Sequence, residues 1–283
     1  LSSDLILACA ARGIRIFFID WRNISVAALS GSNQHAVARF REKQFICIRD
    51  QRSAVIASEI IYSKIRNQRS VLNYFRKGLS EDSEESFALH SGSDSLREIL
   101  RGIAHFEWLT VERWRETLLG LEGSAANIYW SSLVKAHLLP DTFLNREGRG
   151  SLEITNSMLN YGYAILMSQV WAALDNAGFE LYAGFLHSFR PGKPSLVLDV
   201  MEEYRAWIVD RNIIKLRHVA QDKSRLDSSL KKSITDGIFK TLEKSFPYHG
   251  KQVRLDNIIQ RQVYRLAGSV ADDRSYRGYS FKW

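Results

Sequence analysis

The residues best suited to chemistry in this sequence are one histidine and two acids in a single stretch. His187 is followed by Asp199 and Glu202 within GFLHSFRPGKPSLVLDVMEEYR, residues 184–205. The two acids are three residues apart, which puts them on one face of a predicted helix. Their neighbours on that helix are apolar, so we expect both carboxylates at the edge of the core. Ionised acids persist there only beside a cation or hydrogen-bond donors.

A third acid, Glu122, lies upstream in LLGLEGSAANIYW, residues 118–130. Gly120, Gly123 and the small residues after them allow another backbone to approach this acid closely. One imidazole with carboxylates from separate segments suits Mg²⁺ or Mn²⁺, because hard cations prefer oxygen ligands and tolerate one nitrogen. Such a cation polarises a phosphodiester and activates a water or a 3′-hydroxyl for in-line attack. The combination predicts metal-dependent phosphoryl transfer.

Each of these residues also has a simpler structural interpretation. His187 can be a hydrogen-bonded structural histidine, and Glu122 can be an exposed surface acid. Asp199 and Glu202 can be acids of a first helical turn, where they interact with the helix dipole. Taken one at a time, the residues favour these structural interpretations, and only their combination favours a metal site.

The elements that must position these residues are mostly helices. A serine-capped helix is predicted to end at Gly13, and two strands to follow it, over 14–20 and 21–29. From residue 32 the apolar period becomes helical. The acidic, Ser/Gly-rich segment 78–94 is predicted to be a loop, and a capping box of Ser95 and Glu98 to begin the next helix. Helices are predicted over 34–43, 52–77, 95–103, 108–119, 121–137, 157–177, 198–217, 226–245 and 255–266.

This pattern predicts a mainly α fold with two unequal parts. Residues 1–31 are interpreted as the C-terminal part of a small β-rich domain, and residues 32–283 as a large all-α catalytic domain. One helix and two strands cannot close a core alone. We therefore expect preceding residues or another chain to complete the first part.

Composition narrows the classes of function. The chain has 283 residues and a formal net charge of +8, which favours a polyanionic partner such as nucleic acid. Its two distant cysteines argue against a disulfide framework or a Cys-ligated zinc site and fit a reducing interior. No apolar run reaches the roughly 20 residues of a membrane-spanning helix. The sequence contains neither a P-loop nor the motifs of common RNA-binding modules.

The motifs described above also occur together in a known family. The stretch 184–205 closely resembles the signature of the CRISPR-associated spacer integrase, the universal CRISPR adaptation endonuclease. Further matches follow in the family's order, namely the end of its β-rich domain, its basic helix, its first-acid motif, its central helix and its C-terminal tail, at residues 2–20, 63–72, 118–130, 156–180 and 277–283. The resemblance covers nearly the whole chain, apart from 78–94 and 142–154.

The resemblance implies roles for individual residues. The family's metal-binding acid, histidine and second acid fall on Glu122, His187 and Glu202, which are expected to be the catalytic metal ligands. Asp199 matches an acidic position of that site and is expected to support it. Tyr163, in the NYGY motif, either helps to position the reacting strand or packs in the core. Contacts with DNA phosphates are expected from Lys64, Arg66, Arg69, Arg190 and Lys193.

The resemblance also implies the reaction and the partners. The expected enzyme is a DNA integrase of the prokaryotic cytoplasm that uses Mg²⁺ or Mn²⁺. A prespacer 3′-OH attacks a phosphodiester at the end of a CRISPR repeat, both DNA partners being double-stranded. The expected assembly is a homodimer that works with a small ferredoxin-like adaptation subunit. Two alternatives stay open: a simple metal-dependent DNA nuclease, and a non-catalytic basic DNA-binding or architectural subunit.

Members of this family carry further strands before the segment that opens this sequence. Two explanations of the difference are open. The sequence is a trimmed piece, or the integrase is one module of a fusion with a reverse transcriptase or an iron–sulfur nuclease.

Overall fold

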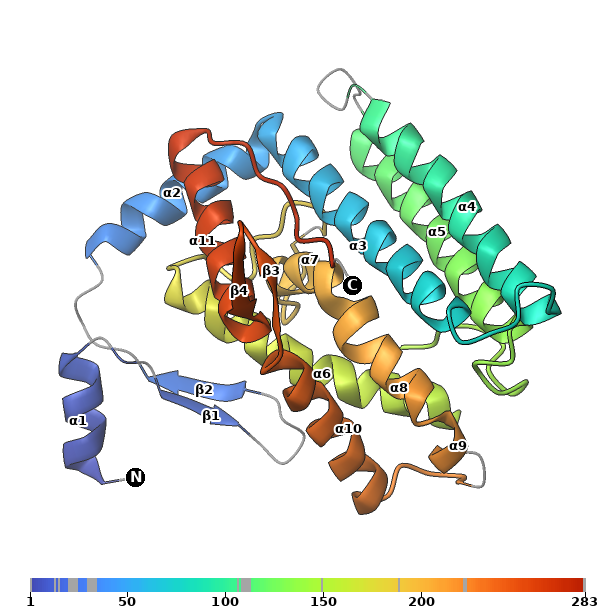
Figure 1. The fold of residues 1–283 in the computed structure, drawn as a ribbon. Coiled ribbons are helices and arrows are strands. Elements are labelled where there is room, and N and C mark those ends of the chain that lie inside the picture. The colour runs from blue at the N-terminus through green and yellow to red at the C-terminus, as the bar shows by residue number, and fades with distance from the viewer. Residues whose placement is uncertain are drawn as a thin grey trace.

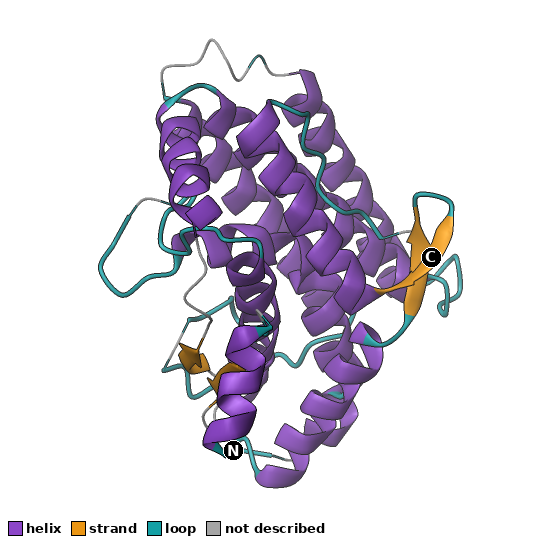
Figure 2. Ribbon diagram, turned by 90° about the vertical axis from the view of Figure 1, so that its left-hand side faces the viewer, coloured by secondary structure: helices purple, strands orange, loops and turns teal. Residues whose placement is uncertain are grey.

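Helices dominate the computed structural model of the chain (Figures 1 and 2). It describes residues 2–12, 14, 16–19, 25–29, 35–105, 107, 113–148, 150–187, 189–220 and 223–281. The strands among these residues form two separate antiparallel hairpins, β1–β2 and β3–β4. The mainly α fold class predicted from the sequence is therefore confirmed. Within the same ranges, none of the helices combines the length and the apolar character that crossing a bilayer requires.

The elements follow one another in an almost wholly helical order. They are α1 (Ser3–Ala11), β1 (Ile16–Ile19), β2 (Ser25–Leu29), α2 (His35–Arg49), α3 (Arg52–Arg76), α4 (Glu84–His105), α5 (Trp114–Lys135), α6 (Ile154–Asn176), α7 (Ser195–Tyr204), the π-helix η2 (Arg205–Asp210), α8 (Arg211–Lys215), α9 (Arg217–Ala220), α10 (Ser228–Leu242), β3 (Ser245–Tyr248), β4 (Lys251–Arg254) and α11 (Leu255–Asp272).

The N-terminal piece has the predicted helix and strands. The Ser2 hydroxyl accepts a hydrogen bond from Leu5 N at 3.3 Å and so caps α1. β1 and β2 pair antiparallel, with Ile16 opposite Leu29. None of the residues of α1 is buried, as expected for a piece without a core of its own. The predicted end of α1 at Gly13, the turn between the strands and the boundary at residues 31 and 32 lie outside the described residues.

The long helix α3 is the central element of the body. It contacts α4 and α5 on one side and α7 and η2 on another (Figure 1). Ile56, Ile60 and Ile65 are fully buried within these contacts, whereas Val55 is 39% exposed. The helix predicted over 52–77 is thus observed, with its isoleucines on the buried face and Val55 outside that face. Because α3 is surrounded, its polar residues also become buried and need partners.

The predicted loop over 78–94 is wrong in its second half, because α4 already begins at Glu84. The Ser83 hydroxyl accepts a hydrogen bond from Ser86 N at 3.1 Å at the start of this helix. Ser95 does not begin a helix; its hydroxyl donates to Ser91 O one turn earlier. The small residues that resembled a loop lie between packed helices instead. Tertiary packing overrides their weak helix propensity.

Other boundaries differ for similar reasons. The two helices predicted on either side of Gly120 are one helix, α5, because an open helical surface tolerates a glycine there. The single helix predicted over 198–217 contains a π-helical segment, η2. The hairpin β3–β4 was not predicted, so the part after residue 32 is not wholly helical.

Gly92 tests the packing of α4. A Cβ at this position would lie 2.0 Å from Ser132 Oγ of α5 and 3.3 Å from Leu72 Cδ1 of α3. We expect Gly92→Ala to lower the free energy of unfolding by about 1–3 kcal/mol, because overpacking forces the helices apart. A Cβ at Gly102 in the same helix would have no neighbour within 4 Å. Gly102→Ala should therefore raise the free energy of unfolding by about 0.5–1 kcal/mol. Urea denaturation of both variants is the measurement; equal effects would contradict the packing described.

Candidate active site

Asp199 organises the loop that carries His187. This carboxylate of α7 is completely buried. It accepts hydrogen bonds from three consecutive backbone N–H groups, Phe185 N at 2.7 Å, Leu186 N at 2.9 Å and His187 N at 3.1 Å. These three hydrogen bonds satisfy the buried carboxylate and attach the loop to α7. The donors belong to the loop and not to the first turn of α7, so the helix-dipole interpretation of Asp199 is wrong.

The loop can approach Asp199 only because its first residue is a glycine. A Cβ on Gly184 would lie 2.6 Å from Asp199 Oδ2 and 2.9 Å from Ser195 Cβ. Arg115 of α5 holds the loop from the other side, donating to Phe185 O at 3.0 Å and Leu186 O at 2.9 Å. The loop is therefore fixed between α5 and α7.

Asp199 also fixes the imidazole of His187. The His187 Nδ1 atom lies in hydrogen-bonding contact with Asp199 Oδ1. A carboxylate at Nδ1 orients the ring and makes Nε2 the nitrogen that can bind a metal or a substrate. This geometry is the one expected for a supporting acid, and it also agrees with a hydrogen-bonded histidine.

The two glutamates meet at one lysine. Lys64 of α3 forms ion pairs with Glu122 of α5 and with Glu202 of α7, the latter at 2.8 Å between Nζ and Oε2. Arg205 of η2 pairs with the other oxygen of Glu202, at 2.9 Å. Residues 64, 122 and 202 are thus brought together from three helices. Glu122 is partly buried, not the exposed acid of the simpler interpretation.

The charges of this cluster stabilise each other. Burial alone would raise the pKa of Glu202, but the charges of Arg205 and Lys64 outweigh it and hold this pKa below its ordinary value. The charge of His187 acts in the same direction on the pKa of Glu202. Burial lowers the pKa of Lys64, but Glu202 and Glu122 together raise it above its ordinary value. Both shifts favour the charged forms of Glu202 and Lys64.

The donor set of the cluster fits a divalent cation. Two carboxylates and one imidazole are suitable ligands for Mg²⁺ or Mn²⁺. Glu202 Oε2 is buried and has no hydrogen-bond donor among the described residues, although Lys64 Nζ lies at ion-pair distance. In the described ranges no three His, Cys, Asp or Glu side chains lie at metal-binding spacing. The Lys64 ammonium is the cation between the two carboxylates.

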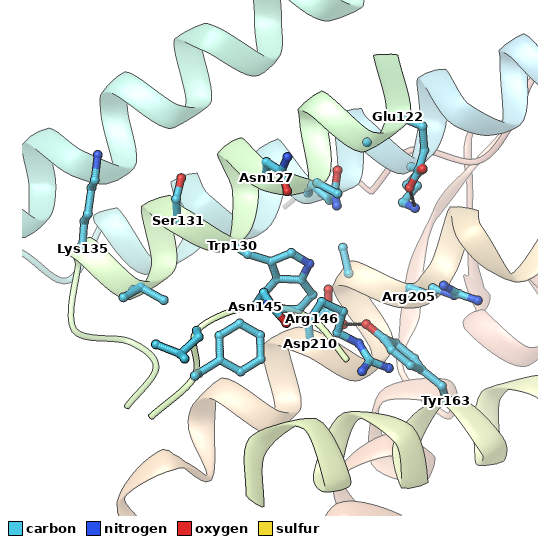
Figure 3. A pocket seen from close by; sticks show the side chains of 18 residues that line it. Glu122, Asn127, Trp130, Ser131, Lys135, Asn145, Arg146, Tyr163, Arg205 and Asp210 are labelled. Atoms are coloured by element: carbon cyan, nitrogen blue, oxygen red, sulfur yellow. Dashed lines mark hydrogen bonds and ion pairs between the residues drawn. The ribbon is translucent and has the colours of Figure 1, made fainter. Parts of the chain in front are cut away.

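A cavity of about 640 Å³ opens beside Glu122 and Lys64. It follows α5, and Trp130 projects from this helix toward Asn145 and Arg146 (Figure 3). Its walls combine aromatic rings, side-chain amides and cations. Aromatic rings stack on bases, and guanidinium groups bind phosphates. The lining therefore suits a nucleotide strand.

Tyr163 lies in the wall of this cavity, held by Asp210. Its hydroxyl donates to Asp210 Oδ1 at 2.6 Å. The guanidinium groups of Arg146 and Arg205 lie over its ring, 5.1 Å and 5.0 Å from the centroid. Burial and the charge of Asp210 raise the pKa of Tyr163 well above its ordinary value. Burial raises the pKa of Asp210 to about 6, despite the hydrogen bond from Tyr163.

Comparison with known proteins identifies the family of this chain. The family model described as CRISPR associated protein Cas1 matches residues 1–237. A CRISPR-associated endonuclease Cas1 from Francisella tularensis subsp. novicida is 47% identical over 282 residues, covering 100% of this chain and 85% of the relative. The chain belongs to the Cas1 family. The resemblance inferred from the sequence motifs is thereby confirmed.

Solved structures agree with the Cas1 fold. A casposase bound to an integration product superimposes with a TM-score of 0.73 at 24% identity, covering 98% of this chain and 81% of the casposase. A Cas6-RT-Cas1–Cas2 complex gives a TM-score of 0.74 at 21% identity, covering 99% of this chain and 31% of the matched chain.

The residues predicted to contact DNA differ in their surroundings. Arg66 and Arg190 are exposed, and Lys193 is half-buried beside Arg190. Arg69 donates to Ser93 O and Oγ, both at 3.1 Å, and so is anchored on α4. Lys64 is buried and paired with Glu122 and Glu202, and its predicted contact with a DNA phosphate stays a prediction.

Several side chains at this site were not predicted. Arg205 follows Glu202 by three residues, and that i, i+3 spacing was a detectable signal. Arg146 and Asp210 had no such signal in the sequence, because they line the cavity from different elements of the fold. Lys64 was singled out for its charge, but its ion pairs with the two glutamates were not predicted. A sequence pattern reports spacing within one helix and not contacts between helices.

Removing the Lys64 charge tests the ion-pair cluster. Lys64→Met leaves Glu122 and Glu202 without their shared cation, so the pKa of Glu202 should rise. We expect the free energy of unfolding at pH 7 in metal-free buffer to fall by about 3–5 kcal/mol. Lys135→Met removes an exposed charge at the far end of the same cavity. This substitution should change the free energy of unfolding by less than about 0.5 kcal/mol. Urea denaturation measures both; equal losses would show that Lys64 is no more than a surface charge.

Proposed function

We propose that this chain is a metal-dependent DNA integrase of CRISPR adaptation. In this proposal it inserts prespacer DNA into a CRISPR array by 3′-OH transesterification at the repeat ends. The observation that carries it is the convergence of Glu122, Glu202 and Lys64 from three helices, while His187 is oriented by Asp199, three residues before Glu202 in α7. Glu122, His187 and Glu202 would hold Mg²⁺ or Mn²⁺, with Asp199 supporting the histidine.

The proposed reaction exchanges one phosphodiester for another. The oxygen of a prespacer 3′-OH forms a bond to a phosphorus atom at the repeat boundary. The bond between that phosphorus and the 3′-oxygen of the repeat strand breaks. That oxygen takes up a proton, so no nucleotide cofactor is consumed. A divalent ion at the three ligands would stabilise the charge of the transition state and lower the pKa of the attacking hydroxyl.

The chain's own residues prepare this site. Asp199 keeps His187 in one orientation, so little reorganisation is needed when a metal ligand is required. Lys64 balances the two carboxylates and prevents their mutual repulsion before substrate arrives. Arg146 and Arg205 supply positive charge along the adjoining cavity, where strand phosphates would lie.

The partners in the proposal are double-stranded prespacer and repeat DNA, a second copy of the chain and a small ferredoxin-like subunit, in a prokaryotic cytoplasm. The net charge of +8 supports a polyanionic partner. The matched solved structures include a casposase bound to an integration product and a complex that contains Cas2. Those partners belong to the matched proteins, and we extend them to this chain on the basis of family membership.

Substitution of the three ligands tests catalysis. Glu122→Ala, His187→Ala and Glu202→Ala should each reduce joining at least about 100-fold, since each removes a ligand of the reacting metal. DNA affinity should fall far less. The assay supplies a labelled 3′-OH oligonucleotide, a supercoiled repeat-bearing plasmid and Mg²⁺ or Mn²⁺, and EDTA should abolish joining. Glu116→Ala, an exposed acid in the first turn of α5, is the matched control.

The products of the same assay separate the alternatives. Fragments released without any joined strand would favour a simple metal-dependent nuclease. Unchanged activity in all three variants would favour a non-catalytic DNA-binding subunit, and either result would overturn the integrase.

Exposed cations test where the DNA lies. Arg66→Ala, Arg190→Ala and Lys193→Ala should each weaken binding at all sequences and reduce the slope of log affinity against log salt by about one per lost phosphate contact. Lys240→Ala, an exposed lysine of α10, is the control and should change neither. Fluorescence anisotropy between low and physiological salt measures the slope. If DNA affinity did not depend on salt concentration, these surfaces would not be the DNA-binding site.

A further inference from the structure

The C-terminal segment is the motif that the proposed function leaves unexplained. Residues 273–281 leave α11 without regular structure and run back to α3 and α7 (Figure 1). Tyr276, Tyr279 and Phe281 on this segment are as buried as core residues. The segment is therefore packed into the fold as part of its core.

Glu203 joins this segment to the catalytic helix. It is fully buried and follows Glu202 directly in α7. One of its carboxylate oxygens accepts a hydrogen bond from the Tyr276 hydroxyl, and the other accepts one from Tyr279 N at 2.7 Å. Adjacent residues of one helix point in different directions. α7 thus extends one acid into the site and the next acid into the C-terminal segment.

Asn67 ties the segment to α3 as well. Its side-chain Nδ2 donates to Glu203 O at 2.7 Å and to Tyr279 O at 2.8 Å, and its Oδ1 accepts from Phe281 N at 2.9 Å. One completely buried amide therefore connects α3, α7 and the C-terminal segment. Its polar atoms are satisfied only while all three remain in place.

The backbone of the segment lies directly against α3 beside Lys64. A Cβ on Gly278 would lie 2.3 Å from Ser63 Oγ, 2.8 Å from Ser63 Cβ and 3.0 Å from Glu59 O. Ser63 is the residue immediately before Lys64. The segment thus touches the direct neighbours of both Lys64 and Glu202.

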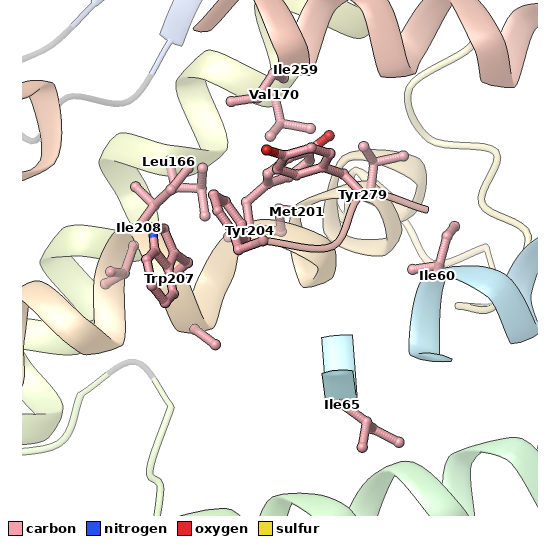
Figure 4. Close-up of a cluster of buried hydrophobic side chains, with 14 of the residues drawn as sticks. Ile60, Ile65, Leu166, Val170, Met201, Tyr204, Trp207, Ile208, Ile259 and Tyr279 are labelled. Atoms are coloured by element: carbon pink, nitrogen blue, oxygen red, sulfur yellow. The ribbon is translucent and has the colours of Figure 1, made fainter. Parts of the chain in front are cut away.

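Aromatic stacking extends the contact to η2. The Tyr279 ring stacks on Tyr204 with centroids 6.4 Å apart (Figure 4), and the Phe281 ring stacks on Trp207 at 5.2 Å. Arg205, the second partner of Glu202, lies between these two residues in sequence. The segment therefore contacts every helix that supplies a partner to Glu202.

We propose that residues 276–281 form a strap that sets the position of α7 against α3 and thereby holds Glu202 at its metal-binding position. Glu203 and Gly278 are then positioning residues, which act through Glu202 and touch neither metal nor DNA. The proposal rests on the metal site of the proposed function. Its physical basis is that a rigid helix transmits a small shift at one residue to its neighbour.

A pair of reciprocal substitutions tests the strap in the full chain. Gly278→Ala should push the strap off Ser63 and weaken Mn²⁺ binding about tenfold, the lower limit for groups that support a ligand. Adding Ser63→Gly removes the two nearest colliding atoms, leaving only the tight contact with Glu59 O at 3.0 Å, and should restore most of the affinity. Mn²⁺ titration followed by electron paramagnetic resonance gives the affinity, with the melting temperature recorded in parallel. Gly92→Ala, which collides with Ser132 between α4 and α5, is the control for general destabilisation and should keep wild-type affinity.

Glu203→Gln is the second variant, because it preserves volume and one carbonyl acceptor. It should also weaken Mn²⁺ binding by about tenfold, the same lower limit as for Gly278→Ala. If Gly278→Ala and Glu203→Gln both bind Mn²⁺ as wild type does while Glu202→Ala does not, the strap is overturned and the metal site stands. If Glu202→Ala itself leaves Mn²⁺ affinity unchanged, the proposed function fails, and the strap fails with it. Equal loss of affinity in Gly92→Ala would also overturn the strap, since instability alone would explain the effect.

Discussion

The structure depends on the placement of one ammonium group between two carboxylates. Lys64, Glu122 and Glu202 come from α3, α5 and α7, and each is partly or fully removed from water. A buried charge without a partner is costly, so each of these helices is constrained by the other two. The arrangement converts an electrostatic requirement into a geometric one. The fold must bring the three helices to ion-pair distance, and the long contacts of α3 with α5 and α7 do so.

The second constraint is the buried carboxylate of Asp199. It collects three backbone N–H groups and an imidazole from one short loop. Gly184 permits this approach, because any side chain there would collide with the carboxylate. The loop has no regular secondary structure of its own. Its shape is imposed by an acid on the neighbouring helix, which explains how a histidine on a loop can be held as firmly as one on a helix.

Buried polar contacts connect the elements around these two centres. The π-helical segment η2 carries both Arg205, which pairs with Glu202, and Asp210, which holds Tyr163. The C-terminal segment is hydrogen-bonded to α3 through Asn67 and to α7 through Glu203. Buried polar groups thus connect the elements near the site, where an apolar contact would allow sliding. Satisfied polar networks select one arrangement because most others leave a buried group unpaired.

The sequence by itself determined the fold class and the family, and it predicted the residues that we propose to carry chemistry. Apolar periodicity predicted most helices, since it reports which face of a helix is buried, and the stretch 184–205 carries the spacing that the loop and α7 require. Residues 84–94 were assigned to a loop because Ser and Gly are weak helix formers, yet packing of Gly92 against Ser132 makes them helical. Only the tertiary structure decided that Lys64 lies between two acids and that Glu203 binds the C-terminal segment. Such contacts join residues far apart in the chain, and local spacing holds no information about which distant side chain fills the space beside them.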